Sequence, residues 1–253
     1  MTKCGVLLVI ATLAAILGAN SGWAQEMKHN ESDPVLTQQP FAIKTFGVFQ
    51  KMMMEGDFTP KATLGDVIES GATIGVGAVS SALGEISIID GTPVVSYGRQ
   101  GKHPVVAAET AALLVTSSVR NWQSIIVDRD VSPEQIEDFL ADVARAHGVE
   151  AARSFPFQLR GTLTPYAMHV NAAPNPHLSR HGVDQPMAIT IKQKGAAISG
   201  EVVGLYVSPE LVGIASHPGE RTHGHWVAQN RKSTAHLDTW GIKAGTVLRL
   251  PKP

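Results

Sequence analysis

Glycine and proline interrupt this chain so often that they limit what it can fold into. The 253 residues include 24 Gly and 15 Pro, which divide most of the chain into short runs. Glycine ends helices and proline breaks them, whereas both are common in the turns that join strands. Between the glycines of residues 72–96 lie short β-branched runs that are typical of strands. The pattern predicts a sheet-based fold instead of a helical bundle.

The composition allows a substantial core and disfavours one class of partner. Hydrophobic residues make up 43% of the chain and charged residues 17%, so it is too apolar to be disordered. Its length permits one large domain or two small ones. With 21 basic and 22 acidic residues, the formal net charge is −1. We therefore expect no nucleic-acid partner, because the chain lacks an excess of basic residues.

The first residues have the pattern of a secretory signal. An apolar run, Gly5–Ala19, follows one early cation and is shorter than the ~20 residues that span a bilayer. Gly22 and Ala24 are small residues at the −3 and −1 positions of a signal-peptidase site. We predict a signal peptide over residues 1–24, cleaved before Gln25, and an exported protein with no membrane span after cleavage. An uncleaved anchor is the alternative, and the shortness of the apolar run disfavours it.

The remaining chain alternates several predicted strands with few helices. Residues 25–44 are polar at first and contain prolines, so we expect a flexible lead-in. Residues 45–253 are expected to form one domain of two sheet-based halves. The predicted fold class is α+β, β-rich, with mixed or antiparallel sheets and a few packed helices. Helices are predicted over 46–54, over 63–70, and from a capping box at Ser132 and Gln135 to Gly148. Strands are predicted within 72–96, where Asp90-Gly91 would form a hairpin turn, and within 187–207, where the turn lies near Gly195. Further strands are predicted over 111–119, 122–127, 155–168 and 246–250.

Three histidines near the C-terminus are predicted to converge on one face of a hairpin. His223 and His225 alternate along a strand, so their side chains point to the same side. A polar turn centred between residues 230 and 231 would place His225 directly opposite His236, with Asp238 across from His223. Three neutral imidazoles with an open fourth position are typical of a catalytic zinc or similar divalent metal site. The alternative is a set of exposed polar residues, and we expect the other histidines, including His217, to be solvated.

Several segments together resemble the alpha-acetolactate decarboxylase family. His223, His225 and His236 have the family's metal-motif spacing, and residues 204–214 resemble the lead-in to that motif. Residues 57–71 and 75–91 resemble two earlier family segments in the same order. The resemblance covers about residues 45–250. It implies that Glu85 falls on the family's active-site glutamate.

The chain also departs from the family pattern. The position that resembles the family's arginine is His169, eight residues after Gly161, while Arg160 precedes that glycine. The family has a second glutamate in a long C-terminal tail, whereas this chain ends 17 residues after His236. A protonated His169 would be a weaker partner for a substrate carboxylate than arginine. Alternatively, it is an ordinary half-buried strand residue.

The resemblance implies conversion of 2-acetolactate to acetoin and carbon dioxide. A divalent metal, with zinc as the expected ion, would act as Lewis acid, and Glu85 would be the proton donor. The expected partner is a small 2-hydroxy-3-keto acid, and a homodimer is left open. The alternative function is a non-catalytic exported relative that keeps the metal and binds a small organic acid or a partner. For Glu85 itself, the alternative is a surface glutamate at a strand end.

Overall fold

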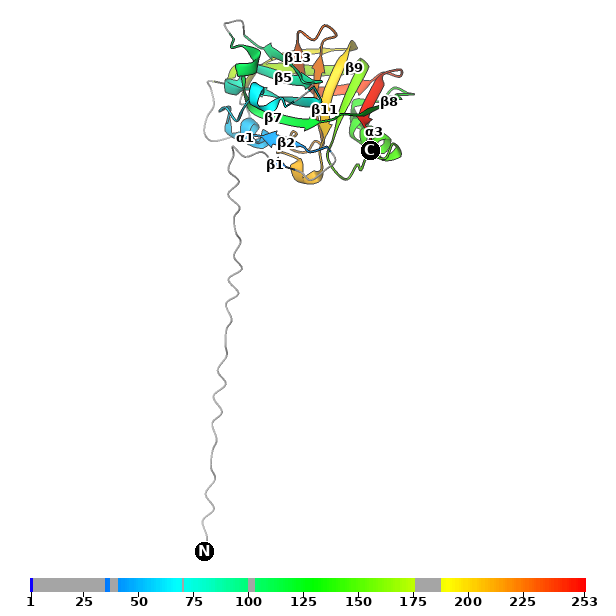
Figure 1. Ribbon diagram of the computed structural model, residues 1–253, viewed down its shortest axis with the longest axis horizontal. Helices are drawn as coiled ribbons and strands as arrows, with labels where there is room; N and C mark the ends of the chain where they lie inside the picture. The colour runs from blue at the N-terminus through cyan, green and yellow to red at the C-terminus, as the bar shows by residue number, and fades with distance from the viewer. Residues whose placement is uncertain (2–34, 37–40, 70, 100–102, 176–187) are drawn as a thin grey trace.

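The fold consists of two seven-stranded sheets, each built from one half of the chain (Figure 1). The computed structural model describes residues 1, 35–36, 41–69, 71–99, 103–175 and 188–253. The predicted signal peptide, apart from Met1, and most of the predicted lead-in lie outside these residues and stay predictions. Every pairing between named strands is antiparallel. The predicted β-rich α+β class is therefore confirmed.

The first sheet contains the strands up to residue 118. Asp90 and Gly91 both have positive φ and join β5 to β6, which confirms the hairpin predicted there. The pairing of β1 with β2 brings two residues of the predicted lead-in, 35 and 36, into this sheet. The sheet order is β1-β2-β7-β4-β5-β6, with β3 also on β7, and the bounds are β1 Val35–Leu36, β2 Lys44–Phe46, β3 Ala62–Thr63, β4 Thr73–Val79, β5 Gly84–Ile89, β6 Thr92–Tyr97 and β7 Thr110–Ser118.

The second sheet is organised by one long strand. β9 (Phe155–Pro174) has 20 residues and extends beyond the predicted end at residue 168. Its first half pairs with β11 and β14, and its second half pairs with β13 and β10. The pairing order β11-β12-β13-β9 returns to β11, so these four strands form a closed ring. The other bounds are β8 Trp122–Ile126, β10 Ala188–Gly195, β11 Ile198–Tyr206, β12 Thr222–Val227, β13 Thr234–Ile242 and β14 Val247–Pro251.

The helices are short and lie on the sheets. The capping box predicted at Ser132 and Gln135 is present, and it begins a 3-10 turn (η3) that continues into α3. The helix predicted over residues 63–70 is shorter, because Ile68 already has extended backbone angles. The bounds are α1 Phe49–Glu55, α2 Leu64–Val67 and α3 Ile136–Ala146, with 3-10 turns η1 Ser80–Ala82, η2 Val106–Ala108, η3 Pro133–Gln135 and η4 Pro209–Leu211.

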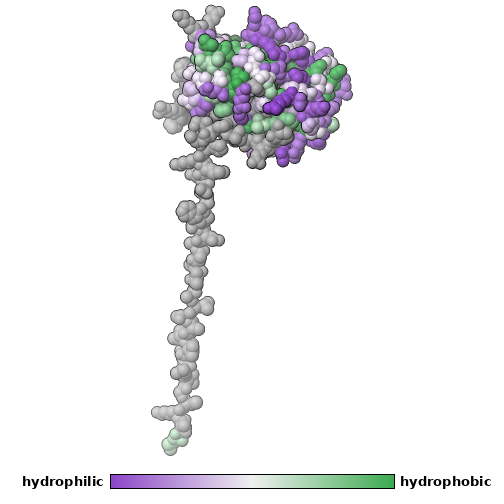
Figure 2. All heavy atoms as spheres, in the orientation of Figure 1, coloured by the Kyte–Doolittle hydropathy of each residue, from purple (hydrophilic) through white to green (hydrophobic). Residues whose placement is uncertain are grey.

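The hydrophobic core has three parts in successive layers. One part packs α3 against the second sheet, one lies between the two sheets and under α1, and one lies between the first sheet and α2. Figure 2 shows polar residues over most of one face, with apolar residues in small groups between them. Within the described part of the chain, no helix has the length and apolar character needed to cross a membrane.

Polar bonds also join the two sheets. The hydroxyls of Ser87 on β5 and Thr234 on β13 lie 2.6 Å apart. The backbone N–H of Thr234 donates to Ser96 Oγ on β6 at 2.7 Å. These buried bonds fix how β5 faces the hairpin of β12 and β13, because a buried hydroxyl or N–H that lost its partner would be costly. The hairpin therefore has one defined position over the first sheet.

Close packing around Gly77 generates the first prediction. A Cβ at this position in β4 would lie 2.0 Å from the carbonyl oxygen of Leu113, whereas at Gly71 the nearest atom would be 4.0 Å away. We expect Gly77→Ala to lower the free energy of unfolding by about 2–3 kcal/mol. Gly71→Ala, the matched control, should change it by less than about 0.5 kcal/mol. Urea denaturation measures both, and equal effects would contradict this account of Gly77.

Candidate metal centre and cavity

The second sheet places four polar side chains in one row across neighbouring strands. His225 on β12 pairs with His236 on β13, as the hairpin register predicted. His236 in turn pairs with His169 on β9, and His169 pairs with Lys192 on β10. Residues directly opposite one another share a face of a sheet. The row brings together side chains that are far apart in the sequence.

The three predicted metal ligands converge on one point. His223, two residues before His225, joins the row from the same face of β12. The three rings have centroids 5.2 Å apart in each pair, and one possible ligand nitrogen from each lies within 4.8 Å of the others. His223 and His225 are buried, and His236 keeps part of its surface open to the cavity described below.

The protonation of these histidines suits a metal. Burial lowers the pKa of His223 to about 4 and lowers the pKa of His225 and of His236 well below the usual imidazole value. All three rings are therefore neutral near pH 7, the form that binds metals. Nδ1–H of His223 donates to the Ala215 carbonyl at 2.9 Å, which leaves Nε2 as its free donor atom. This second bond is typical of histidine ligands.

The placement of the other two rings also supports the fit. Nε2 of His225 and Nδ1 of His236 lie 3.3 Å apart, so their lone pairs can be directed at a shared cation. Unlike His223, His225 has no hydrogen-bond partner for its buried Nδ1 among the described residues. The residues present thus fit a divalent ion, and the three histidines could bind one.

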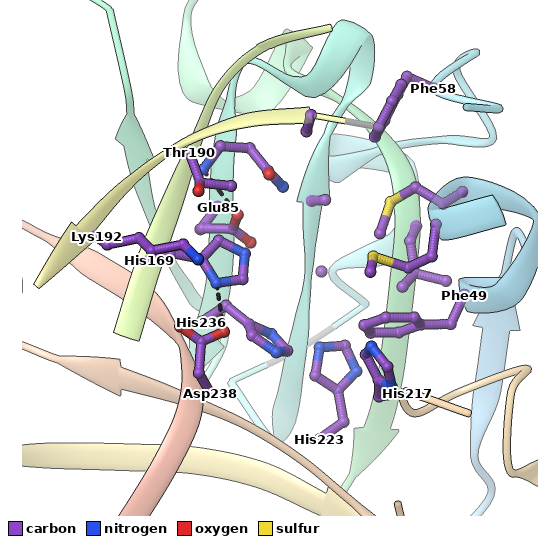
Figure 3. Close-up of a pocket in the computed structure, with 17 residues that line it drawn as sticks. Phe49, Phe58, Glu85, His169, Thr190, Lys192, His217, His223, His236 and Asp238 are labelled. Carbon is purple, nitrogen blue, oxygen red and sulfur yellow. Dashed lines mark hydrogen bonds and ion pairs between the residues drawn. The ribbon is translucent and has the colours of Figure 1, made fainter. Parts of the chain in front are cut away.

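A cavity of about 190 Å³ lies beside the triad, between the two sheets (Figure 3). One wall is polar and carries Glu85, His169, Thr190 and Lys192. The opposite wall is apolar and comes mainly from α1 and the residues after it. Its side chains are Phe49, Met52, Met53 and Phe58.

Glu85 reaches the cavity from the first sheet. It lies on β5, is 2% exposed, and its Oε1 accepts a bond from the Asn171 backbone N–H at 3.1 Å. Its other oxygen, Oε2, is 3.9 Å from His225 Nε2. Burial raises the pKa of Glu85 to about 7, although the charge of His169 and the Asn171 N–H oppose the rise. Glu85 is therefore buried in the seam between the sheets and is not a surface residue.

Asp238 contacts His169, and not His223 as the hairpin register predicted. The pairing of β12 with β13 ends at His225 and His236, and a register shift follows at Asp238, so Asp238 is not paired with His223 as predicted. Its carboxylate instead accepts a bond from Nδ1–H of His169 at 2.6 Å. Burial alone would lower the pKa of His169. The bond to Asp238 and the negative charges of Asp238 and Glu85 outweigh that effect, so the pKa is raised. The half-buried His169 and the exposed Asp238 form an ion pair at the cavity wall.

Sequence reasoning missed several residues of this site. His217 was expected to be solvated, but it lines the cavity, and its ring centroid is 5.6 Å from that of Phe49. Phe49 also contacts the ring of His223 at 5.1 Å. Lys192 belongs to no motif in the sequence, yet it also lines the cavity. Its alternation with Ala188 and Thr190 could have shown that the three share one face of β10.

Two other candidates lie away from the cavity. Arg160 is exposed, and its guanidinium bonds to Glu201 at 3.4 Å. The C-terminus lies beside α3, where Pro253 is close to Gly148 (Figure 1). Neither Arg160 nor the last residues line the cavity. The arginine and the second glutamate of the family pattern therefore have no counterpart among the described residues of this site.

Comparisons with known proteins agree with this fold. The family model described as alpha-acetolactate decarboxylase matches residues 46–249. A search of curated proteins found no match. The alpha-acetolactate decarboxylase of Bacillus subtilis strain 168 is similar in structure, with a TM-score of 0.62, 14% identity, and coverage of 83% of this chain and 86% of that one. A Staphylococcus aureus protein of unknown function, similar to alpha-acetolactate decarboxylase, has a TM-score of 0.58, 14% identity, and coverage of 81% and 82%.

The convergence of the three rings predicts that each is needed for metal binding. We expect His223→Ala, His225→Ala and His236→Ala each to lose stoichiometric metal, because two imidazoles rarely hold a divalent ion tightly. His147→Ala is the matched control, since His147 is exposed at the end of α3. Elemental analysis of the purified variants measures the metal content. Full occupancy in the three triad variants would contradict the site.

Proposed function

The chain belongs to the alpha-acetolactate decarboxylase family, and on that premise we propose that it converts 2-acetolactate to acetoin and carbon dioxide. The single observation that carries the proposal is the meeting of two kinds of group at one cavity. The histidine triad comes from the second sheet and a buried carboxyl group, Glu85, comes from the first. Cation ligands and an acid at one small cavity suit a reaction that needs charge stabilisation and proton delivery.

His223, His225 and His236 would bind the divalent ion, and we propose zinc. Three histidines with an open position are a frequent zinc ligand set. Such an ion, when bound, supplies Lewis acidity toward the hydroxyl and ketone oxygens of the substrate. The chain's own contribution is to hold the rings neutral and oriented. The carbonyl of Ala215 does this for His223.

Glu85 is proposed to deliver the proton. Loss of carbon dioxide breaks a carbon–carbon bond and leaves an electron pair on the carbon that carried the carboxylate. That carbon must take up one proton to give acetoin. The Asn171 N–H holds Oε1, so Oε2 is the oxygen that can carry the proton toward the cavity. A pKa raised to about 7 by burial supports this role, because a protonated form is then available near neutral pH.

His169 is proposed to help bind the substrate carboxylate. Asp238 holds its Nδ1, which leaves Nε2 as the nitrogen able to donate elsewhere. The raised pKa of His169 favours the protonated form that has such a donor. The ion pair with Asp238 also fixes the ring, since a bond of 2.6 Å restricts its rotation. His169 would thus donate one hydrogen bond to the substrate carboxylate. Its positive charge is balanced by Asp238, so the ion pair as a whole has no net charge.

A non-catalytic metal-binding relative is the second candidate. The observation that favours it is the set of residues that line the cavity. Among the described residues, this lining includes no arginine and no glutamate other than Glu85. In that case the protein would bind a small organic acid at the metal without converting it.

The decisive test is an acetoin assay on purified protein loaded with one equivalent of zinc. We expect the unmodified protein to form acetoin from racemic 2-acetolactate. Glu85→Gln keeps the size of the side chain and the bond to Asn171 but has no acidic proton. It should therefore keep its zinc and lose at least about 100-fold in kcat. Near-normal turnover in the variant would reject Glu85 as the acid. Absence of acetoin with fully loaded, unmodified protein would favour the non-catalytic candidate.

The proposed role of His169 gives a separate prediction. His169→Asn can keep a bond to Asp238 but loses the ring nitrogen that faces elsewhere. We expect KM for 2-acetolactate to rise about threefold to tenfold, as the loss of one hydrogen bond predicts. Zinc content should not change. Steady-state kinetics measures the effect, and an unchanged KM would make His169 a structural residue of β9.

A further inference from the structure

We propose that Lys192 binds the carboxylate of the substrate and supplies the positive charge that an arginine would otherwise provide. The inference rests on the proposed function, since it assigns a residue to the same cavity. It concerns a side chain that the sequence motifs do not include. Four observations carry it: the position of Lys192 on its strand, its distance across the sheet from the triad, the charge balance of the cavity, and a matched lysine nearby.

The first observation is that β10 turns one face toward the cavity. Ala188, Thr190 and Lys192 alternate along the strand, and all three line the cavity. The residues between them, Ile189 and Ile191, are exposed. Figure 3 shows the Lys192 side chain running from β10 toward the ring of His169. The Lys192 side chain therefore lies on the polar wall of the cavity.

The second observation is the spacing across the sheet. Lys192 pairs with His169, and His169 pairs with His236 of the triad. Two strand spacings, about 10 Å, thus separate the backbone of Lys192 from that of His236. A lysine side chain can span much of that distance. A substrate whose carboxylate, hydroxyl and ketone sit on adjacent carbons could then contact the triad with two oxygens and Lys192 with its carboxylate.

The third observation is the charge balance. Apart from the ion that the triad would bind, the cavity offers few positive charges, because His169 forms an ion pair with Asp238. Arg160 on β9 and Arg231 in the turn between β12 and β13 bond to Glu201 and do not line the cavity. Among the described residues of the cavity, Lys192 is the one lysine or arginine, and no described carboxylate lies within ion-pair distance of it. Besides the ion proposed at the triad, a carboxylate entering this cavity would meet one side-chain cation without a described carboxylate partner, Lys192.

The fourth observation is that Lys194 provides a built-in comparison. It lies on the same strand and on the same face as Lys192, and it pairs with Ala167. Both lysines are exposed, but Lys194 does not line the cavity. If Lys192 were only a solvated lysine on an outer strand, the two residues would behave alike.

Steady-state kinetics tests the proposal first. In zinc-loaded protein, Lys192→Met should raise KM for 2-acetolactate about tenfold, as expected for the loss of one charge-assisted hydrogen bond. Zinc content should be unchanged, and kcat should fall by less than the rise in KM. Lys192→Arg should restore KM to within about threefold, since it keeps the charge. Lys194→Met, the matched control, should leave both constants unchanged. Equal KM values in Lys192→Met and the unmodified protein would overturn the proposal.

A binding measurement separates this inference from the proposed reaction. The probe is the substrate analogue with its ketone reduced to an alcohol, which cannot decarboxylate. The control ligand is the same compound with the carboxylate replaced by a primary amide. Calorimetry on zinc-loaded protein should show that Lys192→Met weakens binding of the acid about tenfold but leaves binding of the amide unchanged. This result would support Lys192 even if no acetoin were formed. Equal losses for acid and amide, or no loss for either, would refute a contact between Lys192 and the carboxylate.

Discussion

The arrangement of the site depends on antiparallel register. His225, His236, His169 and Lys192 come from four strands, yet register places each directly beside the next. The backbone bonds of a sheet fix such a row far more firmly than loops can, because each strand is held along its whole length. β9 contributes most to this order, since its two halves pair with four different strands. The site is thus a property of the whole second sheet.

The first sheet completes the site by docking against this row. It supplies Glu85, and the Asn171 N–H binds that carboxylate across the seam. The hydroxyls of Ser87 and Thr234 form a second buried contact between the sheets. A carboxyl group in such a seam is removed from water, which is the physical cause of its raised pKa. Closing the two sheets therefore both positions Glu85 and changes its acidity.

Local patterns in the sequence predicted much of this, and long-range contacts account for the rest. The capping box at Ser132, the hairpin at Asp90 and the pairing of His225 with His236 depend on neighbouring residues and could be predicted. The bond between His169 and Asp238 could not, because it joins β9 to a register shift in β13. Lys192 enters the site only through the pairing of β10 with β9. No sequence pattern within β9 or β10 predicts that these two strands pair.

The hairpin between β12 and β13 has a consequence for how such chains can diverge. The turn of residues 228–233 sets which side chains of β13 face the cavity, because side chains alternate sides along a strand. A change in this turn that shifted β13 by one residue against its neighbours would move His236 to the opposite face, even though every histidine remained in the sequence. The register of β13 therefore constrains the metal site as the ligands themselves do. A relative with all three histidines and such a shift of β13 would keep the sequence motif but lose the convergence of the three rings.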